Sequence, residues 1–309
     1  MSLAFLPLLA FGVAAASPSP DAALAELRPA SASEGAAAPS HFVTGDGVRI
    51  AYRLDGAPDR PVLILANSIG TTLEMWDLQV PALSKHFRVL RYDMRGHGGS
   101  GVPPGAYSID RLGHDVLELM DALAIERAHL LGLSLGGFVG QWLGVHAPER
   151  IDRLILSNTA AYLGPPRRWD EAIAALREAP DMAATAESFL ANWFPPQMLA
   201  ENGPRVRQFR GMLLATERQG LAGAWAAVRD ADLRRSIALI ERPTLVIAGA
   251  HDTVTLPEHG EFIAAAVPGA TLEILDAVHL PNIERPDAYL RLVLDFLAPA
   301  RLAGDPPER

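Results

Sequence analysis

The chain has 309 residues, of which 49% are hydrophobic and 20% charged, so it can bury a sizeable core and is not globally disordered. This length accommodates one large α/β domain with an insertion, or two small domains. The formal net charge of −9 argues against a surface that binds nucleic acid or an anionic membrane. The chain has no cysteine, and its histidines show no paired metal-ligand spacing. We therefore expect a small molecule as partner, no metal and no stable membrane association.

The first forty residues differ in composition from the rest. Residues 1–16 form an apolar run too short to span a bilayer as a helix, and a segment rich in Ala, Ser and Pro follows up to Ser40. An apolar run that ends in Ala-Ala-Ala-Ser resembles a secretory signal, although no Lys or Arg precedes it. The alternatives are a disordered extension or a start codon upstream of the true one. We exclude residues 1–40 from the predicted fold.

From His41 onward, β-branched runs alternate with helical patterns such as 109–124 and 136–146. The predicted strands are 48–54, 62–68, 88–94, 129–133, 154–158, 244–249 and 271–275. Several are almost entirely apolar, as in VLILA and LVIAG, which is typical of parallel strands buried on both faces. This alternation predicts an α/β fold with a doubly wound, mostly parallel sheet.

One long stretch interrupts the alternation. Residues 162–236 contain no convincing strand, and their helical spacing is broken by several prolines. We predict a helical lid there, inserted into a core formed by residues 41–161 and 237–300.

The sharpest motif is Gly132-Leu133-Ser134-Leu135-Gly136, a G-x-S-x-G that follows an apolar strand and precedes a helix. At such a tight turn the serine backbone is strained, and side chains at the glycine positions would clash with neighbouring chain. The first N–H groups of the following helix then point at a developing oxyanion. The motif predicts that Ser134 is a nucleophile; the alternative is a packing turn of small residues.

A serine hydroxyl needs a base that is held by a third group. In a sheet of this kind the acid and then the base follow the serine along the chain, in loops after strands. Asp252 follows strand 244–249, and His279 follows strand 271–275, so we predict that they are the acid and the base. The rivals are His251, which precedes the acid, and Asp276, which follows the last strand.

The second oxyanion donor is expected in the loop after an early strand. That loop reads Asn67-Ser68-Ile69-Gly70-Thr71, so we predict that the N–H groups of Ile69 and Leu135 form the oxyanion hole. The glycine-rich loop 93–100 follows the next strand, and we interpret Asp93, Arg95 and His97 as mainly structural.

Residues 41–298 resemble the 3-oxoadipate enol-lactonases of the α/β-hydrolase superfamily. The stretches that carry the resemblance are NSIGTTLEMWD (67–77), RYDMRGHGGS (91–100), GLSLGGFVGQWLGVHAPERIDRLILSNTA (132–160), AAVRDADLR (226–234), PTLVIAGAHD (243–252) and HLPNIERP (279–286). The resemblance implies an α/β-hydrolase fold and hydrolysis of an enol-lactone to 3-oxoadipate in the β-ketoadipate pathway, without cofactor or metal. It also implies a cytoplasmic protein, or a periplasmic one if residues 1–16 act as a signal. It places the catalytic triad at Ser134, Asp252 and His279.

Two features depart from the family: the pair Ala224-Trp225 in the lid, and the N-terminal extension. The substrate's carboxylate needs a cationic partner, for which the candidates by charge are Arg167, Arg168, Arg207 and Arg210. Trp169, Trp193 and Arg168 are our predicted substrate-binding residues, and core packing is the alternative for the two tryptophans. The same triad would also serve a carboxylesterase or a carbon–carbon bond hydrolase. A non-catalytic binding protein on this scaffold would have a broken triad.

Overall fold

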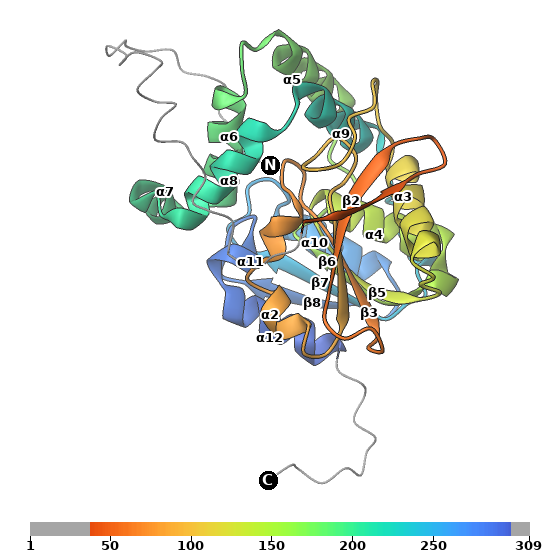
Figure 1. Ribbon diagram of the computed structural model, residues 1–309. Helices are drawn as coiled ribbons and strands as arrows, with labels where there is room; N and C mark the ends of the chain where they lie inside the picture. Colours follow the sequence, from red (N-terminus) through yellow and green to blue (C-terminus); the bar gives the residue numbers. More distant parts are fainter. Residues whose placement is uncertain (1–37, 298–309) are drawn as a thin grey trace. The chain divides into compact units, whose positions relative to one another are not determined.

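The computed structural model describes residues 38–297, and the expectations for residues 1–37 lie outside the described residues. Within that part of the chain, eight strands form one sheet in the order β1-β2-β4-β3-β5-β6-β7-β8 (Figure 1). The strands are β1 (Ser40–Val43), β2 (Arg49–Asp55), β3 (Val62–Ala66), β4 (Arg88–Tyr92), β5 (Ala128–Leu133), β6 (Ile151–Ser157), β7 (Thr244–Gly249) and β8 (Thr271–Leu275). From β4 to β8 all neighbours are parallel, whereas β1 and β2 pair antiparallel at one edge. The predicted α/β fold is therefore confirmed.

Helices pack against both faces of this sheet. The core helices are η1 (Leu73–Trp76), α2 (Val80–Leu83), α3 (Ile109–Ala122), α4 (Leu135–His146), η2 (Pro148–Arg150), η3 (Ile237–Leu239), α10 (Pro257–Ala266), α11 (Pro281–Glu284) and α12 (Pro286–Leu297). One apolar cluster joins the sheet to α3, α4 and α10, and a second joins it to α2 and α12. Alternate residues of the central strands supply the two clusters: in β3, Ile64 faces the first while Leu63 and Leu65 face the second.

The largest differences from the predicted strands concern β1 and the start of β6. β1 was not predicted, because it has only four residues and most of them are exposed, so no apolar alternation marks it. β6 begins at Ile151, three residues before the predicted start, because Asp152 and Arg153 interrupt its apolar run.

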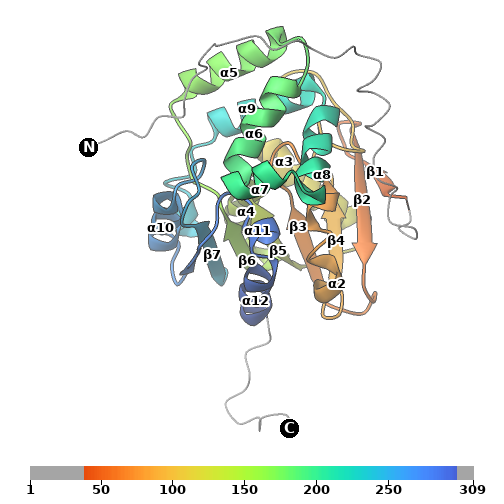
Figure 2. The same cartoon turned by 90° about the vertical axis from the view of Figure 1, so that its left-hand side faces the viewer.

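Residues between β6 and β7 form α5 (Pro166–Glu178), α6 (Ala183–Trp193), α7 (Pro196–Glu201), α8 (Pro204–Ala215) and α9 (Arg218–Asp230), which we call the insertion. In Figure 2 these helices gather beyond the carboxyl-terminal ends of the parallel strands. Within the insertion α5 packs on α9, and α6 packs on α8.

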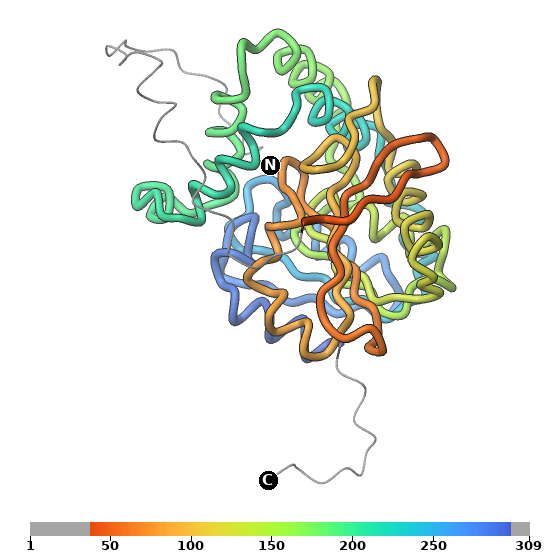
Figure 3. Tube along the Cα trace, viewed as in Figure 1, coloured from red at the N-terminus to blue at the C-terminus, as the bar shows by residue number. Residues whose placement is uncertain are grey.

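The two ends of the insertion lie side by side. Tyr162 and Asp232 form an isolated antiparallel bridge, and the N–H of Leu233 donates to the carbonyl of Ala161 at 2.8 Å. In Figure 3 the chain leaves the sheet after β6 and returns to the adjacent β7. The insertion is thus closed at a narrow neck.

A close contact between α3 and α4 gives a test of the core packing. A Cβ on Gly113 would lie 2.0 Å from Cε3 of Trp142, whereas a Cβ on Gly211, in α8, would meet nothing within 4 Å. We predict that Gly113→Ala lowers the free energy of unfolding by about 1–3 kcal/mol, whereas Gly211→Ala raises it by up to about 1 kcal/mol. Urea denaturation of both variants is the measurement, and a Gly113→Ala protein as stable as the wild type would contradict the packing.

Candidate active site

Ser134 lies at the tight turn between β5 and α4. Its backbone has φ 57° and ψ −114°, a left-handed conformation that a non-glycine residue rarely adopts. A Cβ on Gly132 would lie 2.1 Å from the carbonyl oxygen of Gly136, and one on Gly136 would lie 2.2 Å from that of Ala66. Both glycines of the motif are therefore required by backbone packing. The Ser134 residue itself is 8% exposed.

His279 and Asp252 are directly paired. Nδ1 of His279 lies 2.8 Å from Oδ2 of Asp252, and the two residues are 1% and 2% exposed. Both follow the carboxyl-terminal ends of parallel strands, as Ser134 does, so the sheet brings all three to one edge. Within residues 38–297 no hydrogen bond joins the Ser134 hydroxyl to His279.

Both oxygens of the Asp252 carboxylate accept hydrogen bonds. Oδ1 accepts the N–H groups of Val254 and Thr255 at 2.8 and 3.0 Å. Oδ2 accepts hydrogen bonds from Nδ2 of Asn158 at 2.9 Å and from the Thr255 hydroxyl at 2.7 Å, in addition to the one from Nδ1 of His279. Burial alone would raise the pKa of Asp252, but the charge and hydrogen bond of His279, with the Asn158 and Thr255 hydrogen bonds, hold that pKa below its usual range. The carboxyl group is therefore ionised near neutral pH.

The rival residues lie elsewhere. Nε2 of His251 lies 2.8 Å from Oδ1 of Asp276, and their side chains are 64% and 79% exposed. Arg285 also reaches Asp276, with its guanidinium 3.3 Å from Oδ2. This is an exposed ion cluster at the surface, and it shares no hydrogen bond with Asp252 or His279.

Two backbone N–H groups have no hydrogen-bond acceptor within the described residues: that of Leu135, next to Ser134, and that of Ile69, in the loop after β3. Every amide next to them donates: Ser68 to Sδ of Met75 (3.3 Å), Gly70 to Nε2 of His97 (3.0 Å), Ser134 to the Ser157 carbonyl (2.9 Å) and Gly136 to the Asn67 carbonyl (3.0 Å). The last of these bonds joins the loop after β3 to the start of α4. Buried amides are normally paired, so an unpaired couple at this place can bind an anionic oxygen.

The end of β6 connects Ser134 to the Asp252–His279 pair, and sequence reasoning had not assigned it a role. The Thr159 hydroxyl donates to the Ser134 carbonyl at 2.7 Å. Asn158, with φ 42°, donates from Nδ2 to Oδ2 of Asp252 and also to the Val278 carbonyl at 3.2 Å. The available signal was a polar Asn-Thr pair directly after a buried parallel strand.

The predicted substrate-binding residues occupy different environments. Trp193 is 1% exposed and packs edge-on against Phe189 and Phe209. Trp169 is half-buried, and its Nε1 donates to the Leu163 carbonyl at 2.7 Å. Arg168 is exposed on α5.

The loop after β4 is held by buried polar contacts. Oδ1 of Asp93 accepts the Leu73 N–H at 2.7 Å, and Oδ2 accepts the Gly99 N–H at 2.8 Å. Burial raises the pKa of Asp93 to about 6. The guanidinium of Arg95 lies between Asp115 and Asp46, with N···O distances of 2.6 and 2.9 Å. These contacts hold the loop in one conformation.

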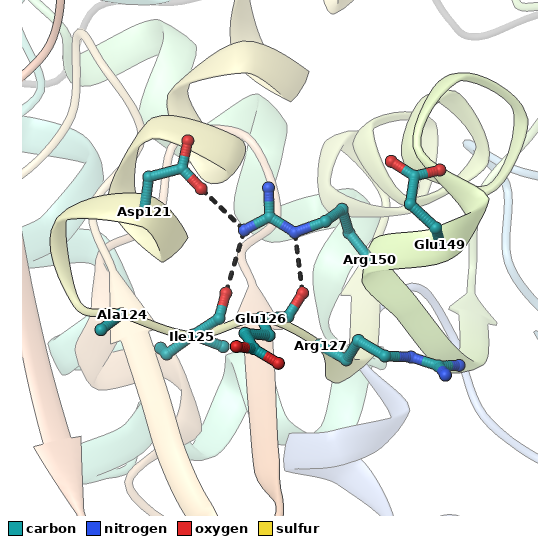
Figure 4. A pocket seen from close by; sticks show the side chains of 7 residues that line it. All are labelled: Asp121, Ala124, Ile125, Glu126, Arg127, Glu149 and Arg150. Atoms are coloured by element: carbon teal, nitrogen blue, oxygen red, sulfur yellow. Dashed lines mark hydrogen bonds and ion pairs between the residues drawn. The ribbon is translucent and has the colours of Figure 1, made fainter.

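A surface hollow at the opposite end of the sheet is not connected to this site. The hollow lies just before the amino-terminal ends of β5 and β6 (Figure 4), and it is lined by Asp121, Ala124, Ile125, Glu126, Arg127, Glu149 and Arg150. The Arg150 guanidinium donates to Oδ1 of Asp121 and to the carbonyls of Ile125 and Glu126, at 2.8 to 2.9 Å. Arg150 thereby braces the connection between α3 and β5.

Residues 38–297 contain no group of three or more His, Asp or Glu side chains placed to hold a metal ion. In the same part of the chain, no helix is long and apolar enough to cross a membrane.

Comparison with known proteins places the chain in a family. Residues 61–286 match the family model described as the alpha/beta hydrolase fold. The chain is 38% identical to 3-oxoadipate enol-lactonase 2 of Acinetobacter baylyi, over 81% of this chain and 94% of the relative. It is 30% identical to the putative carbamate hydrolase RutD of Pseudomonas savastanoi pv. phaseolicola, over 77% of this chain and 94% of the relative. The crystal structure of a hydrolase from Pseudomonas aeruginosa PA01 is 63% identical, with a TM-score of 0.84 over 84% of this chain and 98% of that chain. The resemblance expected from the sequence is thus confirmed, and the chain belongs to the alpha/beta-hydrolase family.

Proposed function

We propose that the chain hydrolyses 3-oxoadipate enol-lactone to 3-oxoadipate in the β-ketoadipate pathway, with Ser134 as nucleophile, His279 as base and Asp252 as the acid that orients the base. The observation that carries this proposal is the buried 2.8 Å pair of His279 and Asp252, at the same sheet edge as the strained Ser134 turn. The 38% identity to an enol-lactonase supports the choice of substrate.

The acylation step follows from the positions of these groups. His279 takes the Ser134 proton at Nε2 as the serine oxygen adds to the lactone carbonyl, and the charge on Asp252 stabilises the imidazolium that forms. Contacts between a catalytic serine and its base are often long in a free enzyme and tighten when the substrate binds. The unpaired amides of Ile69 and Leu135 stabilise the oxyanion, and one such donor typically contributes roughly 10²–10³ in rate.

Ring opening then breaks the bond between the carbonyl carbon and the ring oxygen. The leaving group is an enol, which receives the proton from His279 and tautomerises to the ketone. A water molecule, deprotonated by His279, attacks the acyl-enzyme and releases the carboxylate product and free Ser134. The protons balance over the cycle, because His279 accepts and donates one in each half.

We further propose that the insertion serves as a lid, and that Trp169, Trp193 and Arg168 contact the substrate. Contacts of the insertion with the site support this role. A Cβ on Gly70, next to Ile69, would lie 2.8 Å from Leu213 of α8 and 3.5 Å from Trp193 of α6. The Thr253 hydroxyl, beside Asp252, donates to Oδ1 of Asn192 at 3.2 Å.

The substrate and the nucleophile are tested together. We expect turnover of the enol-lactone to exceed that of p-nitrophenyl acetate and of a meta-cleavage product, and Ser134→Ala to lower kcat by on the order of 10⁶. Side-by-side kcat/KM values are the measurement. Preference for simple neutral esters would reject the lactonase assignment, whereas full turnover by Ser134→Ala would reject the triad.

Asn158 is expected to matter for catalysis because it holds both Asp252 and the loop of His279. We predict that Asn158→Gly, which tolerates the left-handed backbone but loses the amide, lowers kcat about tenfold, in line with the loss of a charge-assisted hydrogen bond. The matched control is Asn202→Gly, because Asn202 has nearly the same backbone (φ 43°) on the exposed end of α7. Equal activities of the two variants would contradict the role of Asn158.

Arg168 is the proposed partner of the substrate's free carboxylate. Of the four candidate arginines, Arg167 pairs with Glu171, Arg210 pairs with Glu187 and Arg207 donates to the Asn202 carbonyl. Within residues 38–297 the Arg168 guanidinium contacts no carboxylate. We predict that Arg168→Ala raises KM for the enol-lactone severalfold but leaves KM for p-nitrophenyl acetate unchanged, since an exposed ion pair contributes up to about 1 kcal/mol.

The matched control is Arg167→Ala, which removes the neighbouring exposed charge on the same helix. An equal rise in KM for both variants would indicate a general effect of charge, and would remove Arg168 from the proposed site.

A further inference from the structure

The predicted oxyanion donor Ile69 lies in a turn formed by residues 68–71. The Ser68 carbonyl accepts the N–H of Thr71 at 3.3 Å and its hydroxyl at 2.7 Å. Gly70 has φ 75°, whereas Ile69 has a negative φ. This combination is typical of a type II turn, whose third position favours glycine.

The N–H of the central peptide of this turn is bound by a histidine from the next loop. Gly70 N–H donates to Nε2 of His97 at 3.0 Å, and Nδ1 of His97 lies 3.2 Å from the Arg95 carbonyl. Because a carbonyl can only accept, Nδ1 carries the ring proton and Nε2 is left as the acceptor. His97 is 3% exposed, and burial lowers its pKa to about 4, so the imidazole stays neutral near pH 7.

The backbone of His97 is also held in place by its loop. The backbone N–H of His97 donates to the Met94 carbonyl, and the backbone carbonyl of His97 accepts the Ser100 N–H, both at 3.0 Å. The same loop is closed by the hydrogen bond from Gly99 to Asp93. The acceptor for Gly70 is therefore fixed before any substrate binds.

We propose that His97 is a positioning residue for the oxyanion hole: it fixes the peptide after Ile69, while Thr71 fixes the peptide before it. With both peptides anchored, the backbone of Ile69 cannot rotate, and its N–H stays directed at the substrate oxygen. His97 does not touch the substrate. The inference rests on the proposed function, because it assumes that Ile69 N–H stabilises an oxyanion.

Two polar variants separate the two contacts of the ring. In His97→Asn the shorter amide can still donate to the Arg95 carbonyl but does not reach Gly70, so the Gly70 N–H is left buried without an acceptor. In His97→Gln the longer side chain places an amide oxygen near the former position of Nε2 and restores the acceptor. The matched control is His129→Asn, because His129 is a half-buried histidine at the amino-terminal end of β5, away from Ser134.

The assay uses p-nitrophenyl acetate, so that it does not depend on the identity of the natural substrate. We expect His97→Asn to lower kcat roughly ten- to a hundredfold with little change in KM, and His97→Gln to recover most of the loss. His129→Asn should keep wild-type kcat. Thermal unfolding of all three variants shows whether the folded fraction is unchanged.

A transition-state mimic provides a second readout. Ser134 Oγ adds to the boron of phenylboronic acid as its proton passes to His279, and one oxygen of the resulting boronate anion occupies the oxyanion hole. We expect the inhibition constant to rise in His97→Asn by the same factor by which kcat/KM falls, a correlation that a purely structural role does not produce.

Three outcomes decide the inference. A lower kcat in His97→Asn that His97→Gln restores supports the inference, whereas equal kcat in His97→Asn and His129→Asn overturns it. A lower kcat in His97→Asn that His97→Gln does not restore, with an unchanged inhibition constant for the boronate, also overturns it, since the defect then lies outside the oxyanion hole. The proposed function fails separately, if the Ser134→Ala protein hydrolyses the ester as fast as the wild type.

Discussion

The buried carboxylate of Asp252 is the constraint on which the arrangement of the site depends. An ionised group removed from water is stable only when its oxygens are fully hydrogen-bonded and a partner shares its charge. Asp252 meets this condition with donors from its own loop, from Asn158 at the end of β6 and from His279 after β8. The loops after three neighbouring strands are therefore held together by one charge, and the imidazole is oriented as a consequence.

The sheet and the residues at its carboxyl-terminal edge could be predicted from the sequence, because both depend on local patterns. Apolar runs such as VLILA identify the buried strands, and G-x-S-x-G identifies the turn at Ser134. The order of residues along the chain favoured Asp252 and His279 over His251 and Asp276. In the structure the two pairs differ in burial: Asp252 and His279 are buried, whereas His251 and Asp276 are exposed.

The supporting contacts could not be predicted in the same way. Asn158 lies 94 positions from Asp252 in the sequence, and its pairing depends on how the ends of β6 and β7 meet. His97 reads as one more polar residue in a glycine-rich loop, and its bond to Gly70 appears only when β3 and β4 are neighbours. The short edge strand β1 escaped prediction for a different reason, since an exposed strand of four residues carries no apolar pattern.

The narrow neck of the insertion has a consequence for how such a protein can change during evolution. Because the chain leaves after β6 and returns to its direct neighbour β7, the sheet is continuous whether the intervening segment is long or short. The bridge between Tyr162 and Asp232 closes the neck independently of the helices beyond it. Insertions with closely spaced ends are tolerated thermodynamically, since loop-closure entropy grows only slowly with length. Recombination could therefore exchange the whole segment as a cassette, while Ser134, Asp252 and His279 keep their positions at the edge of the sheet.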